Sequence, residues 1–331
     1  MQRILVIQNK RIGDVVLTAP VLDVLRSRFP EAALFLVMDE ACRGIESLLP
    51  GIEPLFFHKK RLNFALWKRV FSQRWDLCLE FTGTDRGALI AGASMASVRA
   101  TYLRHGNSAG RRYVFNRFID ADVRRLHTID YHLHLVKGLG IKADEARRGV
   151  SVSPEKQQAA RDFLTGRGLQ ADFAVIHPGA ARSEKMWGVE KWIRIADFLT
   201  STLGLNVVFT GGGHSDELEQ IKQISARISG KIFSVAGETT LDQLAAILAL
   251  SRIYVGVDTG AAHIADALNI PSAVLFGSTN PRHWGPRGAR GRAVGAAGFS
   301  SYPHDFPKSS MQAVSASQVE AAIVSALEKI E

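Results

Sequence analysis

The sequence has no long apolar segment and only two cysteines, and both absences narrow the classes of protein to consider. No uninterrupted apolar run reaches the roughly 18 residues that cross a bilayer as a helix. The first residues, MQRILVIQNKR, have a short apolar core and no small-residue cleavage site, which favours a first β-strand over a secretory signal. Cys42 and Cys78 lie in apolar contexts without the spacing of metal ligands. We therefore expect reduced core cysteines in a cytosolic protein.

Several motifs of common enzyme classes are also missing. No G-x-G-x-x-G follows the first apolar run, which argues against a Rossmann-type oxidoreductase, and neither G-x-x-x-x-G-K-[ST] nor H-E-x-x-H occurs. His132 and His134 are two residues apart on an expected helix, so they should point to different faces and not share a metal ion. We expect no metal, no cofactor and no nucleic-acid partner.

The charge of the chain is distributed unevenly. The 331 residues are 46% apolar and 22% charged, as in a soluble globular protein long enough for two domains, and the net charge is +9. Residues 1–170 hold 27 Lys and Arg against 17 Asp and Glu, whereas residues 171–331 hold 14 against 15. A field of this sign favours an anionic macromolecule or membrane surface as the partner of the first half. For any single basic pair, such as Lys68-Arg69, a solvated surface is the simpler interpretation.

Apolar runs alternate with helix-period segments along the whole chain, which predicts an α/β protein with parallel sheets. We expect two doubly wound, Rossmann-like domains, at residues 1–150 and 151–331, that face each other across a cleft. The polar stretch Lys142–Ser153 is the expected junction, and a closing helix at Ser317–Ile330 could pack back on the first domain. Pro20 is expected in the first turn of a helix. The expected strands are Ile4–Ile7, Leu34–Met38, Leu55–His58, Leu77–Phe81, Val98–Leu103, Phe173–Ile176, Val207–Thr210, Ile232–Val235, Ile253–Val257 and Ala273–Phe276. The expected helices between them are Val16–Phe29, Cys42–Leu49, Leu62–Ser72, Arg86–Ala93, His127–Leu139, Pro154–Leu164, Val189–Leu203, Ser215–Ser229, Leu241–Leu250 and Ala261–Leu268.

The segment YVGVDTGAAHIADALNIPSAVLFGSTNPRHWGP, at residues 254–286, carries the most specific pattern. A strand should stop at Asp258-Thr259-Gly260, and a helix with small residues at its start should follow. Free backbone N–H groups and the positive helix end then meet at one spot, which suits a phosphate. Asp258 and His263 flank that spot with side chains that can grip a ribose or a phosphate.

A second loop, IHPGAARSEKMW at residues 176–187, also leaves a strand. The small residues Gly179, Ala180 and Ala181 allow a ligand to approach the backbone, and Lys185 is a point charge suited to a departing phosphate. Trp187 and Trp192 are expected to be packing residues. The glycine run around Gly212 is a weak signal for a base or ribose, and Thr240 with Gln243 predicts a capped helix start.

The first expected strand ends in QNKRIGD, which places Asp14 where a helix begins at the top of the sheet. A carboxylate there is either a helix N-cap or a general base in a cleft. Lys10 and Arg11 can hold an acidic substrate nearby.

Four stretches together resemble glycosyltransferase family 9, the ADP-heptose:lipopolysaccharide heptosyltransferases. They are RIGDVVLTAPVLDVLRSRFP, HPGAARSEKMWGVEKW, VAGETTLDQLAAIL and DTGAAHIADALNIPSAVLFGSTNPRHWGP, and they span both halves. The resemblance implies a GT-B fold and an inverting, metal-independent, hexosyltransferase-like enzyme of Gram-negative bacteria that moves heptose from ADP-heptose to the lipopolysaccharide core. It also implies a cytoplasmic enzyme, peripheral at the cytoplasmic face of the inner membrane.

The resemblance implies roles for individual residues as well. Asp14 matches the proposed general base, Lys185 matches the lysine that neutralises the departing diphosphate, and Asp258, Thr259, Gly260 and His263 match the nucleotide-holding segment. An anionic core acceptor would be bound by Lys10, Arg11, Lys59, Lys60 and Arg61. Ala180-Ala181 departs from the hydroxyl residues that many members have there, which leaves the phosphate grip to backbone N–H groups. Two alternatives remain: the same chemistry on another glycan or a protein acceptor, and a non-catalytic nucleotide or anionic-glycolipid binding module.

Overall fold

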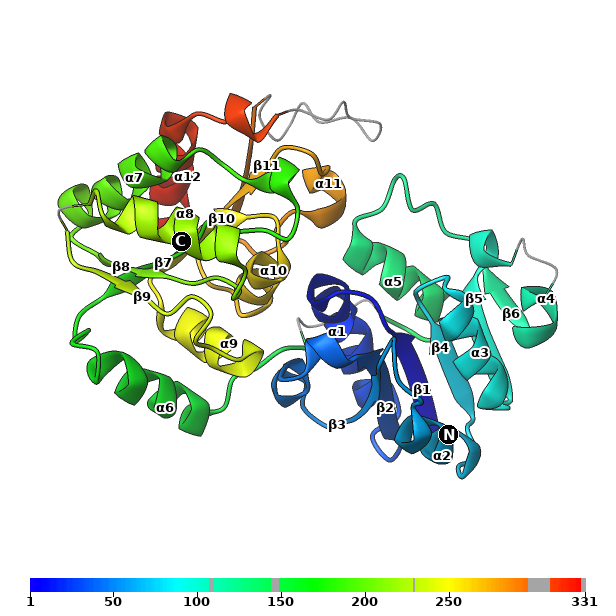
Figure 1. The fold of residues 1–331 in the computed structure, drawn as a ribbon. Coiled ribbons are helices and arrows are strands. Elements are labelled where there is room, and N and C mark those ends of the chain that lie inside the picture. Colours follow the sequence, from blue (N-terminus) through cyan, green and yellow to red (C-terminus); the bar gives the residue numbers. More distant parts are fainter. Residues whose placement is uncertain (107–109, 144–148, 229, 297–309, 329–331) are drawn as a thin grey trace. The chain divides into compact units, whose positions relative to one another are not determined.

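The computed structural model describes residues 1–106, 110–143, 149–228, 230–296 and 310–328. The chain divides into two compact units, Met1–Ser151 and Val152–Glu331 (Figure 1). None of the helices in the described residues combines the length and the apolar character of a membrane span.

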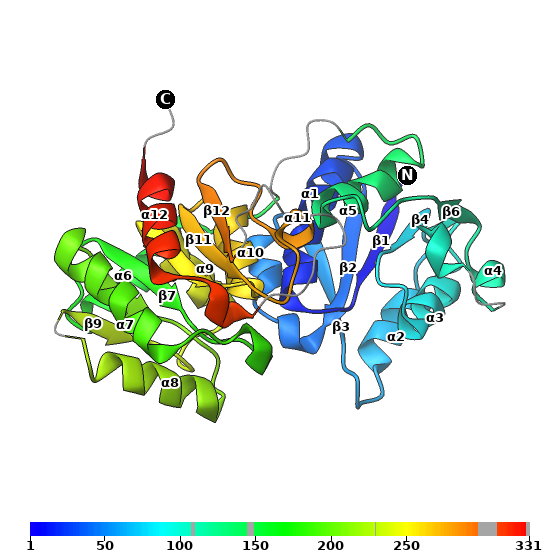
Figure 2. The ribbon, with the colours of Figure 1, turned by 90° about the horizontal axis from the view of Figure 1, so that it is seen from above.

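The first unit is a six-stranded parallel sheet covered by helices. Its strands are β1 (Arg3–Gln8), β2 (Ala33–Asp39), β3 (Ile52–Phe57), β4 (Leu77–Glu80), β5 (Val98–Tyr102) and β6 (Arg117–Ile119). Its helices are α1 (Ile12–Arg28), α2 (Phe64–Phe71), α3 (Asp85–Ala93), α4 (Arg111–Val114) and α5 (Thr128–Lys137). Helices α1 and α5 pack together on one face of the sheet, and α2, α3 and α4 follow one another on the other face (Figure 2).

The second unit repeats this architecture. Its strands are β7 (Phe173–His177), β8 (Asn206–Phe209), β9 (Ile232–Ser234), β10 (Ile253–Val257), β11 (Ser272–Phe276) and β12 (Gly291–Gly295). Its helices are α6 (Pro154–Thr165), α7 (Val189–Asp197), α8 (Ser215–Ser225), α9 (Leu241–Leu250), α10 (Gly260–Ala267), α11 (Pro281–Trp284) and α12 (Ala316–Leu327).

The two sheets have the same strand order. The first runs β3-β2-β1-β4-β5-β6, and the second runs β9-β8-β7-β10-β11-β12, so each reads 3-2-1-4-5-6 within its unit. The central strands are buried on both faces, as the near-continuous apolar runs of their sequence require. In each sheet the chain reverses its direction of travel between the first and fourth strands, and the carboxyl ends at such a switch point form the usual ligand crevice of this topology.

Helix α1 differs from its prediction at both its start and its proline. It begins at Ile12, so Pro20 lies in the helix interior and not in the first turn, which corrects that prediction. Every residue from Val15 to Leu25 is buried. Proline removes one backbone hydrogen bond, and we attribute its tolerance here to tertiary packing along this fully buried stretch.

One expected helix was predicted wrongly, and several short elements, two strands among them, were missed. Residues Cys42–Leu49 form parts of two short 3-10 turns, Glu40–Cys42 and Ile45–Leu48, in place of one helix. Gly44 at φ +100° separates them, a conformation that α-helices do not contain. Strands β6 and β12 were not anticipated, because the short run Arg117–Ile119 and the glycine-bounded Gly291–Gly295 lack a clear apolar pattern.

Two helices of the second unit, α7 and α12, differ in detail from their predictions. Helix α7 continues into one wider helical turn at Phe198–Thr202, and α12 begins after Ser315, whose hydroxyl accepts the N–H of Gln318. Helix α12 packs against β10, β11, β12 and α7 of the same unit. The predicted ends of two helices, Ser229 and Ile330, lie outside the described residues.

Candidate functional site

Two loops meet at the switch point of the second sheet, where β7 and β10 are paired neighbours. One follows β7 and leads from His177 through Gly179 to Lys185; the other follows β10 and carries Asp258 and Thr259. The loops are about 80 residues apart in sequence, and the sheet brings their side chains together. The sequence placed Lys185 and Asp258 in separate motifs, and the structure joins them in one cluster.

Asp258 is the centre of this cluster. Its Oδ2 accepts hydrogen bonds from Lys185 Nζ at 2.6 Å and from Thr279 Oγ1 at 2.7 Å, and its backbone carbonyl accepts a second bond from Lys185 Nζ at 2.7 Å. His263 Nε2 lies 3.5 Å from Asp258 Oδ1. The Asp258 side chain is 7% exposed and that of Lys185 is 16% exposed. The ammonium group is therefore held in place beside the start of α10 and still reaches solvent.

The N-terminus of α10 is the second component of the site. Thr259 occupies the N-cap position, and its side chain accepts none of the first-turn N–H groups. Gly260, Ala261 and Ala262 follow, so no large side chain stands over these donors. Uncapped N–H groups, the positive helix end and a lysine ammonium together favour an anion such as a phosphate.

Near this cluster, two glycine-containing loops pack closely against the buried Glu217. A Cβ on Gly179 would lie 1.9 Å from the Glu217 carboxylate, and one on Gly211 would lie 2.7 Å from it, so both loops close directly on this side chain. The Gly212 N–H donates to Glu217 Oε2 at 2.9 Å. Burial raises the pKa of Glu217, although the Gly212 N–H partly opposes the shift.

Sequence reasoning did not single out Glu217. The sequence feature that could have indicated Glu217 is its position, five residues after Gly212 in the same strand-to-helix connection. His177 lies beside it, with Nε2 3.9 Å from Glu217 Oε1, and burial lowers the pKa of His177 to about 4.

The remaining residues predicted for this site have different surroundings. Ala180 is half-buried and packs on the core, whereas Ala181 is exposed. Trp187 and Trp192 are buried and meet edge-to-face at 4.9 Å, which confirms their prediction as packing residues. Thr240 and Gln243 form the predicted capping box at the start of α9.

Asp14 lies at the switch point of the first sheet, after β1 and in the first turn of α1. It is the third helical residue, and its Oδ2 accepts the N–H of Arg11 at 3.4 Å. It is therefore not the N-cap residue itself, although it caps the helix start from inside. The carboxylate is half-buried, and both Lys10 and Arg11 are exposed beside it in the chain.

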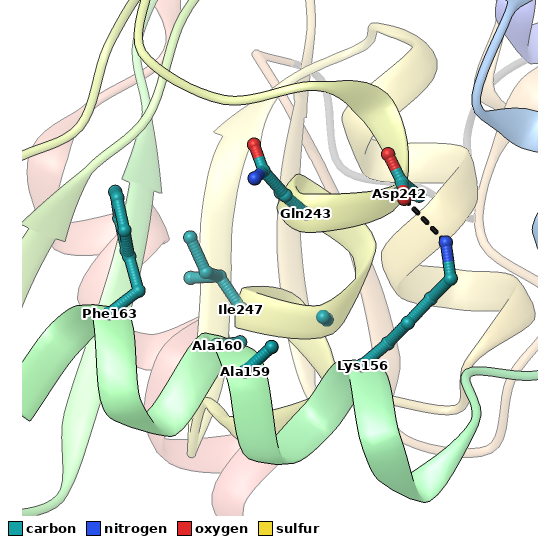
Figure 3. A pocket seen from close by; sticks show the side chains of 8 residues that line it. Lys156, Ala159, Ala160, Phe163, Asp242, Gln243 and Ile247 are labelled. Atoms are coloured by element: carbon teal, nitrogen blue, oxygen red, sulfur yellow. Dashed lines mark hydrogen bonds and ion pairs between the residues drawn. The ribbon is translucent and has the colours of Figure 1, made fainter.

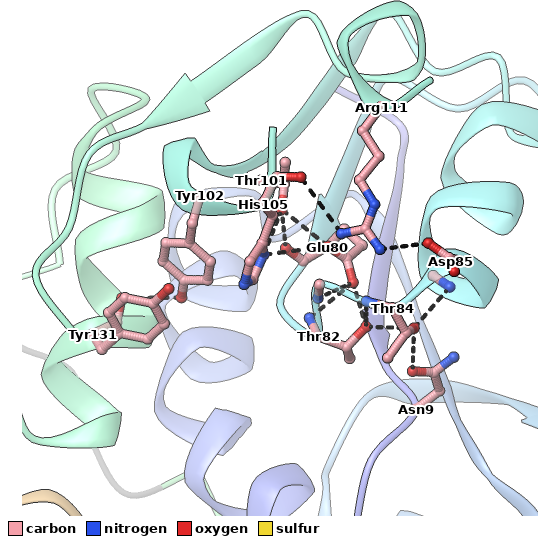
Figure 4. A network of polar contacts seen from close by, with 12 residues as sticks. Asn9, Glu80, Thr82, Thr84, Asp85, Thr101, Tyr102, His105, Arg111 and Tyr131 are labelled. Atoms are coloured by element: carbon pink, nitrogen blue, oxygen red, sulfur yellow. Dashed lines mark hydrogen bonds and ion pairs between the residues drawn. The ribbon is translucent and has the colours of Figure 1, made fainter. Parts of the chain in front are cut away.

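A polar network that the sequence did not predict lies at the same edge of this sheet (Figure 4). The buried Glu80, at the end of β4, accepts hydrogen bonds from the N–H groups of Thr82 and Gly83 at 2.8 and 2.9 Å and from Thr101 Oγ1 at 2.9 Å. The Thr82 hydroxyl also donates to it. All of these donors are neutral.

The network reaches across the switch point. Thr84 Oγ1 lies 3.4 Å from Asn9 Oδ1, which links the loop after β4 to the end of β1. His105 Nδ1 lies 3.2 Å from Thr101 Oγ1, and burial lowers the pKa of His105 to about 4. Hydroxyl, amide and imidazole groups therefore surround the Glu80 carboxylate at this edge of the sheet.

The basic loop after β3 lies at the same carboxyl edge. Lys59 Nζ is 2.8 Å from Asp39 Oδ2, and Asp39 ends β2. Burial alone would raise the pKa of Asp39, but the Lys59 ammonium and the Ala41 N–H outweigh it and hold the pKa below its usual value. Lys60 and Arg61 are exposed.

A cavity, two histidines and two cysteines lie away from the Asp258 cluster. A cavity of about 190 Å³ between α6 and α9 is bounded by the Lys156–Asp242 ion pair and apolar side chains (Figure 3). It has no described residue in common with the Asp258 cluster. His132 is buried and His134 is exposed, as predicted from their spacing. Cys42 and Cys78 are free and buried, also as predicted.

Comparison with known proteins adds independent evidence. Residues 63–314 match the model of glycosyltransferase family 9 (heptosyltransferase). The chain is 26% identical over 285 residues to lipopolysaccharide heptosyltransferase 3 of Escherichia coli, with 83% of each chain covered. It is 23% identical over 288 residues to the lipopolysaccharide core heptosyltransferase OpsX of Haemophilus influenzae, covering 85% of this chain and 80% of that one.

Solved structures show the same fold. A family 9 glycosyltransferase of Veillonella parvula superposes with a TM-score of 0.85 at 23% identity, covering 98% of this chain and 97% of that one. An Escherichia coli heptosyltransferase solved with ADP superposes with a TM-score of 0.78 at 20% identity, covering 98% and 100%. The predicted α/β architecture of GT-B type is thereby confirmed.

Proposed function

Because the chain belongs to glycosyltransferase family 9, we propose that it transfers a heptose from ADP-heptose to a sugar of the lipopolysaccharide inner core. Relatives named as lipopolysaccharide heptosyltransferases support this substrate pair, as does a structural neighbour solved with ADP-2-deoxy-2-fluoro heptose. The observation that carries the proposal is the Lys185–Asp258 contact at the start of α10, because it brings the ammonium group of one loop to the uncapped helix start of another, where a diphosphate can bind.

The proposed reaction is a single displacement at the anomeric carbon. Asp14 takes the proton of the acceptor hydroxyl, the acceptor oxygen forms a bond to the anomeric carbon, and the bond from that carbon to the diphosphate breaks with its electron pair leaving on ADP. Attack opposite the leaving group inverts the configuration. Charge develops on the diphosphate as it departs, and groups already aimed at that charge lower the barrier.

Lys185 and the first turn of α10 take that role in the proposal, without a metal ion. Asp258 and Thr279 orient the ammonium group, and the Gly179 and Gly212 loops allow the nucleotide to approach the backbone. The nucleotide site belongs to the second unit and the acceptor site, with Lys10, Arg11, Lys59, Lys60 and Arg61, to the first. The acceptor is lipid-linked, so we place the enzyme at the cytoplasmic face of the inner membrane.

The test is ADP release from ADP-heptose in the presence of heptose-deficient lipopolysaccharide. We expect release to depend on both substrates, and we expect ADP to raise the melting temperature more than UDP or NAD does. Stabilisation by ADP without release on any glycan or protein acceptor would replace this proposal with a nucleotide-binding module. Release only with a different acceptor would retain the chemistry and change the substrate.

A further inference from the structure

The segment from Pro54 to Trp75 in the first unit contains no acidic residue. It holds six basic residues: Lys59, Lys60, Arg61, Lys68, Arg69 and Arg74. Lys59 pairs with Asp39 and Arg69 pairs with Glu53, both of which lie outside the segment. Within the described residues, the other four make no ion pair and are exposed. The segment therefore presents positive charge that the fold does not neutralise.

Large apolar side chains are exposed in the same segment. Leu62 is 80% exposed, Phe64 is 73% exposed and Phe71 is 69% exposed. Phe64, Lys68 and Phe71 are spaced i, i+4, i+7, so they share one face of α2. Leu66 and Val70 occupy the opposite, buried face and join the core. We call the exposed residues Leu62, Phe64, Lys68 and Phe71 the α2 surface, with Lys60 and Arg61 at its margin.

The α2 surface is held in shape by neighbouring contacts. Asn63 closes the preceding loop, because its Oδ1 accepts the N–H of His58 at 2.7 Å and its Nδ2 donates to the carbonyls of His58 and Arg61 at 3.0 Å each. The Trp67 ring stacks on Phe71 with centroids 6.0 Å apart. The start of α2 is thus held by Asn63, and the exposed Phe71 ring is supported by Trp67.

We propose that the α2 surface docks on an anionic lipid bilayer. Exposed aromatic and leucine side chains are unfavourable in water and can enter the boundary between lipid headgroups and acyl chains. Lysine and arginine beside them attract the lipid phosphates. The segment from Pro54 to Trp75 is complementary in charge to an anionic bilayer, because its charged residues are all basic and none would repel the lipid phosphates. A protein partner would be expected to meet a surface with both signs of charge or a concave pocket, and the described α2 face offers neither.

Docking at the α2 surface would bring the acceptor to the enzyme, and this part of the inference rests on the proposed function. Helix α2 begins immediately after the basic loop at the carboxyl edge of β3. Asp14 follows β1 and therefore lies at the carboxyl edge of the same parallel sheet. A bilayer against α2 would hold a lipid-linked acceptor near that edge.

The test measures binding of the full chain to phosphatidylglycerol-containing vesicles and to pure phosphatidylcholine vesicles by flotation. We expect tight, salt-sensitive binding only to the anionic vesicles. The variant Phe64→Ser/Lys68→Glu changes two α2 positions spaced i, i+4. Its matched control, Leu218→Ser/Lys222→Glu, replaces an exposed apolar residue and a lysine at the same spacing on α8. Each basic residue lost weakens binding by about fivefold, the factor that corresponds to about 1 kcal/mol. We therefore expect at least a tenfold loss in the α2 variant and no loss in the α8 control.

Two results would overturn the proposal: wild-type protein that does not float with anionic vesicles, or an α2 variant that binds them as wild type does. Circular dichroism melting of both variants excludes unfolding as the cause of a loss. Failure of the proposed function has a separate readout. Transfer to a lipid-free core oligosaccharide should be unchanged in Phe64→Ser/Lys68→Glu, whereas transfer to acceptor embedded in anionic vesicles should fall. Vesicle binding without any transfer would retain the docking surface and reject the heptosyltransferase.

Discussion

The two units share one strand order, but they place different chemistry at the equivalent crevice. At the switch point of the second sheet, a lysine and an aspartate form a charged pair beside an uncapped helix start. At that of the first sheet, Glu80 is buried and satisfied by neutral N–H and hydroxyl donors. The units also differ in net charge, since residues 1–151 hold 24 Lys and Arg against 15 Asp and Glu, and residues 152–331 hold 17 of each. Topology thus fixes where a site forms, and side chains decide what it binds.

The largest expected effect separates the roles of the two crevices. Asp14→Asn removes the proposed base, which is worth roughly 10²- to 10⁴-fold in rate, and it should leave ADP binding intact because Asp14 belongs to the other unit. Lys185→Ala should lower both the rate, by on the order of 10²- to 10³-fold, and the affinity for ADP. The measurements are ADP release and the ADP-induced rise in melting temperature. Loss of ADP binding in Asp14→Asn, or full activity in either variant, would contradict this division of labour.

The carboxylates of Glu80 and Asp258 should differ in how much they stabilise the fold, and this effect should be smaller than the effects on rate. Glu80→Ala leaves the N–H groups of Thr82 and Gly83 without their acceptor and removes one partner from the Thr82 and Thr101 hydroxyls, which we expect to cost about 2–4 kcal/mol of unfolding free energy. Asp258→Ala should cost less, about 1–3 kcal/mol, because Lys185 keeps its bond to the Asp258 carbonyl and reaches solvent. Urea unfolding followed by fluorescence measures both.

Glu80→Gln is the matched control for that comparison. It keeps one acceptor oxygen, so it should lose less stability than Glu80→Ala. If Glu80→Ala and Asp258→Ala lowered the unfolding free energy equally, the buried network and the charged pair would contribute equally to stability. That result would contradict the expected difference between the two crevices.

The difference in stability between the two units should also depend on acid. Burial lowers the pKa of His105 to about 4 and that of His132 to about 3 in the first unit, and that of His177 to about 4 in the second. The unfolded chain binds these protons near pH 6.5, before the folded chain does, so stability is lost as pH falls below about 6.5, at up to about 2 kcal/mol per buried histidine by pH 5. Glu217 has a raised pKa and acts in the opposite sense, because its folded form binds the proton first.

Acid should therefore weaken the first unit more than the second. Hydrogen exchange of peptides from β1 and β7, corrected for the intrinsic pH dependence of exchange, measures each unit by itself. His132→Asn should reduce the loss in β1. A larger loss of protection in β7 than in β1 would contradict the expectation.

Much of the fold follows from the sequence, because buried parallel strands leave continuous apolar runs. Strand β10 agrees with its prediction at both ends, and Cys42 and Cys78 lie in the core as expected. The failures have local causes. Pro20 was predicted in the first turn because proline is disfavoured in a helix interior, whereas α1 holds it inside a stretch that is buried from Val15 to Leu25. Strands β6 and β12 contain arginine and glycine in place of an apolar run.

The site was predictable one motif at a time. Asp258 and Lys185 were each chosen from their own loop, but their contact depends on the pairing of β7 with β10, which no local pattern encodes. Glu80 and Glu217 were missed because a glutamate in a single sequence is usually a solvated residue. Only the burial and the surrounding glycines and donors show that these two are different.

The position of β1 at the centre of its sheet has a consequence for the time course of synthesis. Its apolar residues, Ile4–Ile7, are made long before one of its two partners, β4, which begins only at Leu77. At ribosomal rates of roughly 5–20 residues per second, one edge of β1 waits for roughly 4–14 seconds before that partner exists. An unpaired apolar edge recruits other strands. The nascent chain is therefore exposed to aggregation between the synthesis of β1 and that of β4, and the second unit passes through a similar interval between β7 and β10.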